Sequence, residues 1–120
     1  MARKRSQTRI VDDAGGTLAV ATVADRPLTR MVGLLGRSGL APGDGLVIRP
    51  CNAIHTWFMR FPIDVVFLDA DGVVLRAVEA LPPFRLASGG RRARVTIELP
   101  AGTLRRFAVA PGAHVRMAPA

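Results

Sequence analysis

The strongest constraint on the fold is the run Ile63–Leu68, which is rich in Val, Ile and Phe and interrupted by a single charge, Asp64. Such a composition is typical of a buried β-strand. The next four residues, DADG at 69–72, form a tight-turn sequence, and residues 73–80 are again rich in apolar side chains. The sequence therefore predicts a β-hairpin at the centre of the chain, to which the remaining segments are added.

Short apolar segments separated by turn residues predict further strands. They lie at residues 7–11, 17–23, 46–48, 53–59, 95–99 and 113–117. The first two flank the turn sequence DDAGG and predict a second hairpin. Residues 81–93 contain two prolines and two glycines, which predicts a long loop without regular structure.

One short helix is predicted over residues 26–35, in the amino-terminal half of the chain. Asp25 is a suitable N-cap, and the apolar residues Leu28, Met31, Val32 and Leu35 recur at helical spacing. Many short strands with a single helix indicate a mostly β fold, either a compact antiparallel sandwich or a partly closed barrel.

The length and composition indicate one globular domain. The chain has 120 residues and a hydrophobic content of 49%, so residues 7–120 are predicted to form a single domain and the basic residues 1–6 a flexible tail. No apolar run approaches the length of a membrane span or of a signal sequence. A single Cys permits no intrachain disulfide, and these features together predict a cytoplasmic protein.

The formal net charge of +8 predicts a weak, non-specific attraction to anions, including nucleic acids. A nucleic-acid reader is expected to combine basic residues with exposed aromatic ones. With no Tyr and five Phe, the chain shows no such interleaving along the sequence. The charge alone therefore predicts no specific partner.

His55, Trp57 and Met59 are predicted to share one face of an extended strand, because side chains alternate along a strand. A His beside Trp and Met can line a pocket as an acid, a base or a ligand. The alternative is a half-buried His whose ring nitrogen bonds to the backbone.

Asp64 and Glu98 are the two carboxylates that fall within predicted strands. Asp64 must be paired or hydrogen-bonded, because an isolated buried charge is costly. It is expected either to line a pocket, or to pair with Arg60 or Arg37 or cap loop amides. Glu98 is expected to face solvent, with an alternative placement in the same concavity as Asp64.

No metal or cofactor is predicted. Cys51 and His55 are close in sequence, but their spacing in an extended chain separates them by over ~13 Å. The glycine-rich segment GLLGRSGLAPGDG lacks the preceding strand and following helix of a phosphate-binding loop. No catalytic residue can be assigned from a motif.

Four stretches carry a resemblance to a known family. They are ADRPLTRMVGLLGR (24–37), AIHTWFMRFPIDVVFLDADGVV (53–74), IELPAGT (97–103) and PGAHV (111–115). Together they resemble the DUF192 family of small bacterial and archaeal proteins over roughly residues 17–118. The resemblance implies a compact, largely β sandwich with one short helix near the amino terminus, and it implies no established activity.

Three functions are compatible with these residues. The first is a small-ligand or peptide-binding module, whose pocket near His55 and Asp64 also includes Trp57 and Met59, with Arg37 and Glu98 as further candidates. The second is an enzyme that uses Asp64 or His55 as an acid or base. The third is a basic interaction protein that binds nucleic acid or an acidic partner.

Overall fold

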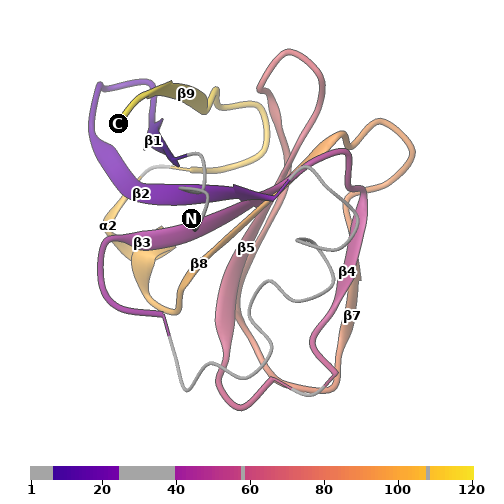
Figure 1. Ribbon diagram of the computed structural model, residues 1–120. Helices are drawn as coiled ribbons and strands as arrows, with labels where there is room; N and C mark the ends of the chain where they lie inside the picture. Colours follow the sequence, from indigo (N-terminus) through magenta and orange to yellow (C-terminus); the bar gives the residue numbers. More distant parts are fainter. Residues whose placement is uncertain (1–6, 25–39, 58, 108) are drawn as a thin grey trace, which may run out of the picture.

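The computed structural model describes residues 7–24, 40–57, 59–107 and 109–120, whose regular secondary structure is almost entirely β-strand (Figure 1). The mostly β fold expected from the sequence is confirmed. The helix predicted over residues 26–35 lies outside the described residues. In chain order the described elements are β1 (Gln7–Val11), β2 (Thr17–Ala24), β3 (Asp44–Ile48), β4 (Ala53–His55), β5 (Ile63–Leu68), β6 (Val74–Leu81), β7 (Leu86–Ser88), β8 (Val95–Pro100), α2 (Thr103–Arg106) and β9 (Arg116–Pro119).

Seven strands form one sheet in the order β6-β5-β8-β3-β2-β1-β9, and β4 pairs with β7 in a second, two-stranded sheet. Neighbouring strands are antiparallel except β2 and β3, which are parallel, so the large sheet is mixed. Within the described part of the chain, no pairing joins the end strands β6 and β9. The large sheet is therefore not closed into a barrel.

Both predicted hairpins are present. β1 pairs with β2 and β5 pairs with β6, each in antiparallel register. Gly72 closes the central hairpin with φ of 84°, a conformation that favours glycine. A Cβ at this position would lie 2.6 Å from the Val115 carbonyl oxygen, so the turn also packs against the carboxyl-terminal segment.

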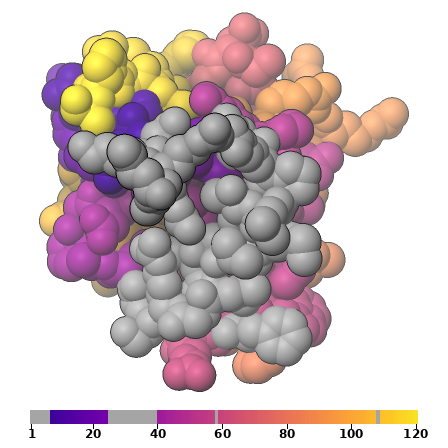
Figure 2. All heavy atoms as spheres, in the orientation of Figure 1, coloured from indigo at the N-terminus to yellow at the C-terminus, as the bar shows by residue number. Residues whose placement is uncertain are grey.

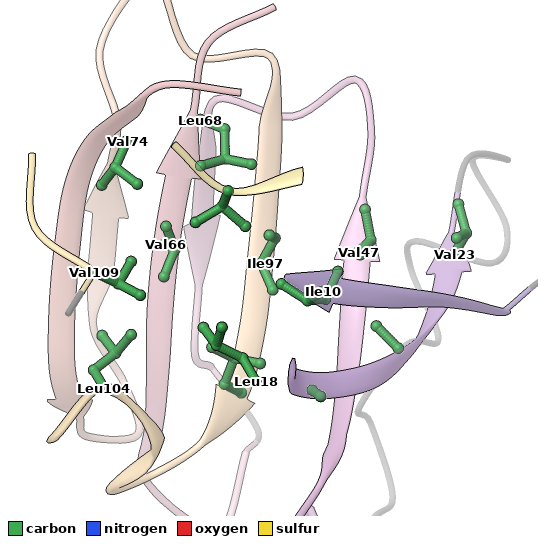
Figure 3. Packing of buried hydrophobic residues seen from close by; sticks show 14 residues of the cluster. Ile10, Leu18, Val23, Val47, Val66, Leu68, Val74, Ile97, Leu104 and Val109 are labelled. Carbon is green, nitrogen blue, oxygen red and sulfur yellow. The ribbon is translucent and has the colours of Figure 1, made fainter. Parts of the chain in front are cut away.

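Alternate residues of β5 enter two separate hydrophobic cores. Val66 and Leu68 belong to the first core, together with Ile97, Leu99 and Leu104 (Figure 3). Val65 and Phe67 belong to the second core. Because neighbouring side chains of a strand point in opposite directions, the two cores lie on opposite faces of the large sheet. This explains why all of β5 is buried.

The small sheet differs from the prediction in two places. The strand predicted over residues 53–59 ends at His55, and the predicted loop over residues 81–93 contains β7. The prolines and glycines of that segment flank β7 and do not interrupt it. Ile54 and Ala87 are register partners, and both are buried in the second core. Apolar burial therefore stabilises a strand that local composition argues against.

Gly89 allows the small sheet to approach the large one. A Cβ at Gly89 would lie 2.4 Å from the Phe67 Cβ and 2.8 Å from the Ala93 Cβ. Phe67 is fully buried on β5, so no side chain fits between it and the end of β7. The small sheet thus covers the face of the large sheet that carries the second core.

The carboxyl-terminal part of the chain contains a short helix and the final strand, which begins three residues later than predicted. After β8 the chain forms the short helix α2, whose Leu104 enters the first core. The final strand, predicted over residues 113–117, is β9, which pairs with β1 and is preceded by an isolated bridge between Val73 and His114. No helix in the described part of the chain has the length and apolar character needed to cross a membrane.

Candidate functional site

Asp64 is fully buried and its carboxylate is satisfied by backbone amides. Its Oδ1 accepts a hydrogen bond from Ala80 N (2.8 Å), and its Oδ2 accepts bonds from Gly102 N (3.1 Å) and Leu104 N (2.9 Å). These bonds connect β5 to the end of β6 and to the start of α2. Of the roles expected for Asp64, the geometry matches the one in which its carboxylate accepts hydrogen bonds from loop amides. Arg60 is exposed, and Arg37 lies outside the described residues.

Asp64 and Glu98 do not share a concavity. Asp64 is the register partner of Leu99, whereas Glu98 is the partner of Val65 on β5. Leu99 belongs to the first core and Val65 to the second. Because register partners point to the same face, the two carboxylates lie on opposite faces of the sheet.

Glu98 is buried, and the expectation that it faces solvent is wrong. Its side chain is 5% exposed, between Leu46 on β3 and Val65 on β5. The prediction failed because β8 is an interior strand whose second face is covered by the second core. Burial raises the pKa of the Glu98 carboxyl from its ordinary 4.5 to about 7. No hydrogen bond links this carboxyl to another described residue. The rise in its pKa is therefore due to desolvation.

His55, Trp57 and Met59 do not share one face. Met59 is buried in the second core, while His55 is exposed and Trp57 is 42% exposed. The His55 and Trp57 rings form an edge-to-face pair with centroids 5.6 Å apart. The predicted alternation fails because β4 ends at His55 and the chain turns there, with Met59 N donating to the Thr56 carbonyl at 3.2 Å.

Thr56 fastens this turn to the segment before β7. Its hydroxyl donates to the Pro82 carbonyl (2.6 Å) and accepts from Arg85 N (2.8 Å). Its backbone N donates to the Arg85 carbonyl (2.8 Å), and its carbonyl accepts from Phe84 N (3.0 Å). Thr56 is itself fully buried. These contacts place Phe84 and Arg85 beside the His55–Trp57 pair.

Phe84 and Leu86 are exposed apolar residues that sequence reasoning missed. Phe84 is 59% exposed and Leu86 is 71% exposed. Leu86 is the register partner of His55, so both point outward from the small sheet, opposite to Ile54 and Ala87. Phe84 also has φ of 60°, which is unfavourable for a bulky side chain. A proline-rich loop gives no sequence signal for such an exposed ring.

We call His55, Trp57, Phe84, Arg85 and Leu86 the basic aromatic surface. Of the four exposed large hydrophobic side chains in the described residues, three belong to it, and only Val20 lies elsewhere. The surface occupies the outer side of β4 and β7, on the right in Figure 1. The connection from β7 to β8, orange at the upper right, projects from the body of the molecule (Figure 2). Exposed apolar side chains that gather in one place mark interaction sites.

The segments that carry this surface are strongly basic. Residues 49–60 and 82–94 contain no Asp or Glu. Their arginines are all exposed: Arg49, Arg60, Arg85, Arg91, Arg92 and Arg94. In the described residues, no group of three or more His, Cys, Asp or Glu is placed to hold a metal ion. The site therefore offers cationic and aromatic groups.

Known proteins match this chain over nearly its whole length. The family model DUF192, described as Uncharacterized ACR, matches residues 9–117. No protein with curated annotation matches the chain. A crystal structure of a candidate transcription regulator from Sinorhizobium meliloti is similar, with a TM-score of 0.81, 23% identity and 98% of each chain covered. A protein of unknown function from Novosphingobium aromaticivorans is similar with a TM-score of 0.79 and 17% identity, over 93% of this chain and 84% of that one.

Proposed function

The chain belongs to the DUF192 family, and we propose that it is a binding module for an anionic partner, with the basic aromatic surface as its binding site. One observation carries the proposal: exposed Trp57, Phe84 and Leu86 gather beside Arg85, in segments that contain no acidic residue. Apolar side chains left in water are retained where a partner covers them. The arginines of these segments form no ion pair with a described acidic residue, and they define the charge of that partner.

The segments of this surface carry no acidic residue of their own, and Asp69 and Asp71 lie in the neighbouring turn after β5, where the Arg94 N donates to the Leu68 carbonyl at 2.8 Å. Asp64 and Glu98 are buried, and Glu79 lies 3.7 Å from the Arg105 guanidinium, at α2. α2 packs on the first core, across the large sheet from the small one. An anionic ligand at the basic aromatic surface therefore gains attraction from several arginines without repulsion from its own segments.

This proposal places binding at His55 and Trp57 and leaves Asp64 out. Asp64 already accepts three backbone hydrogen bonds on the other face of the large sheet, so it has little capacity left for a ligand. The name of the Sinorhizobium meliloti protein, a candidate transcription regulator, is compatible with an anionic partner. The proposal itself depends on the surface of this chain.

Binding can be followed through Trp57, which is the only tryptophan. We expect its fluorescence to change when either of two polyanions, oligothymidylate or polyglutamate, is added at low salt. The apparent affinity is expected to fall steeply as salt is raised, because binding releases counterions. If neither polyanion changes the fluorescence or co-migrates with the protein, the proposal is wrong.

A matched pair of variants separates the surface from the overall charge. Arg85→Glu reverses a charge within the basic aromatic surface, and we expect it to weaken binding and to lower the salt dependence. Arg106→Glu makes the same change in net charge at an exposed position of α2, on the opposite side of the large sheet. Equal loss in both variants would indicate diffuse attraction without a defined site.

A further inference from the structure

We infer that the partner of the basic aromatic surface is single-stranded nucleic acid, an inference that rests on the proposed function and names its ligand class. The surface presents three aromatic rings, from His55, Trp57 and Phe84, next to arginines. Nucleic-acid single strands are bound by stacking of bases on such rings while cationic side chains follow the phosphates. The rings and charges that the sequence separates are brought together by the fold.

The segments that carry the rings are held in fixed positions. His55 ends β4, and Trp57 packs edge to face against it. The backbone at Phe84 is fixed from the other segment, since Phe84 N donates to the Thr56 carbonyl and Arg85 N donates to the Thr56 hydroxyl. A ring that is already fixed loses little conformational entropy when a base stacks on it.

The backbone at Phe84 supports a role in binding. A phenylalanine with φ of 60° is strained, and the same turn would be less strained with Gly or Asn. The strain is not offset by burial of the ring, which is 59% exposed. Retaining an exposed, strained aromatic residue is explained when its ring contacts a ligand.

Arginines flank the rings at both ends of the small sheet. Arg60 follows Trp57 by three residues, whereas Arg91 and Arg92 lie in the turn after β7. Arg76 adds a further cation near that end, since its guanidinium donates to the Ser88 carbonyl at 3.0 Å. An extended polyanion laid along the outer side of β4 and β7 therefore meets positive charge before and after the rings.

The same features favour a single strand over two other anionic partners. A duplex keeps its bases stacked inside, so the exposed rings would have no base to contact. An acidic peptide satisfies the arginines but carries few flat groups for three rings. The chemistry of the surface matches a ligand in which every repeat has one anionic group and one planar group.

The test compares binding of three polyanions to the full chain by fluorescence anisotropy. They are a labelled oligothymidylate of about 10 residues, a duplex of the same length and polyglutamate. We expect the single strand to bind at least tenfold more tightly than the other two at equal salt. Tight binding of polyglutamate or duplex with no preference for the single strand would overturn the inference and leave the proposed function standing.

Ring variants give an independent test. Trp57→Leu and Phe84→Leu are each expected to weaken oligothymidylate binding about tenfold or more, because each removes one stacking partner. Trp57→Phe retains a ring and is expected to lose much less. The same variants should bind polyglutamate like the wild type, and circular dichroism shows whether they remain folded. Equal loss of both ligands would indicate that the rings support the fold and do not stack on bases.

Discussion

Asp64 and Glu98 lie on neighbouring strands of one sheet, yet their carboxyl groups point to opposite faces of it. Asp64 faces the first core with three backbone amides as partners, and Glu98 faces the second core between Leu46 and Val65. The two acids therefore have different energetics. The Asp64 carboxyl is satisfied by backbone hydrogen bonds, whereas burial raises the pKa of the Glu98 carboxyl to about 7.

Replacing Asp64 is expected to destabilise the fold strongly. Asp64→Ala leaves three backbone N–H groups without their acceptor, and each buried unsatisfied donor costs about 1–3 kcal/mol. We expect the free energy of unfolding, measured by urea denaturation, to fall by about 3 kcal/mol or more. The control Asp71→Asn changes an exposed turn residue and should cost under about 0.5 kcal/mol. Equal, small effects in both variants would contradict the structural role of Asp64.

Glu98 is expected to make stability depend on pH. Its carboxyl has an ordinary pKa of 4.5 in the unfolded chain and a pKa of about 7 in the folded one. Between these values the folded state binds more protons, so its stabilising contribution is complete below pH 4.5 and is lost as the pH rises through about 7. A difference of this size corresponds to about 3 kcal/mol in the free energy of unfolding.

The variant Glu98→Gln isolates this contribution, since its side chain stays uncharged. Urea denaturation between about pH 5 and pH 8 should show a shallower fall in stability for the variant than for the wild type. Above pH 7 the variant should be the more stable protein. If the two proteins have parallel pH profiles, the Glu98 carboxyl does not titrate in this range.

Much of the fold could be predicted because its strands have strong local signals. β5 is a run of apolar, β-branched residues bounded by a turn sequence, and the β1–β2 and β5–β6 hairpins follow from Gly and Asp in their turns. β7 could not be predicted in this way. It has three residues between prolines and glycines, and it exists because Ala87 packs with Ile54 over the second core.

The candidate site was predicted only in part, for a similar reason. His55 and Trp57 stand out in the sequence as rare residue types, but the alternation that grouped them with Met59 ends when the chain turns at Thr56. Phe84 and Leu86 are brought to them by hydrogen bonds between segments far apart in the chain. Nothing in local composition indicates those bonds. The rings and arginines therefore alternate only in the folded structure and not along the sequence.

Gly89 is expected to tolerate no side chain. In Gly89→Ala the new Cβ would overlap Phe67 and Ala93, both buried, so the small sheet must move away. Overpacking of this kind costs about 1–3 kcal/mol, which urea denaturation measures. Gly90→Ala is the comparison, because its Cβ meets nothing within 4 Å, although φ of 88° adds strain of about 1 kcal/mol. A smaller loss in Gly89→Ala than in Gly90→Ala would contradict the close approach.

Thr56 is expected to act as a positioning residue for the basic aromatic surface. Thr56→Val has nearly the same shape but lacks the hydroxyl, so Arg85 N–H and the Pro82 carbonyl lose a partner. The free energy of unfolding should fall by about 1–3 kcal/mol. Oligothymidylate binding should weaken as well, because the segment that carries Phe84 is no longer fixed beside Trp57.

The serine variant provides the control for Thr56. Thr56→Ser keeps the hydroxyl, so it should retain most of the binding affinity that Thr56→Val loses, even though it also loses a buried methyl group at a cost of about 1 kcal/mol. Binding is measured by anisotropy under conditions in which circular dichroism shows that both variants are folded. If serine and valine weaken oligothymidylate binding equally, the hydroxyl does not position the rings, and the contact of Thr56 with the two segments acts through packing alone.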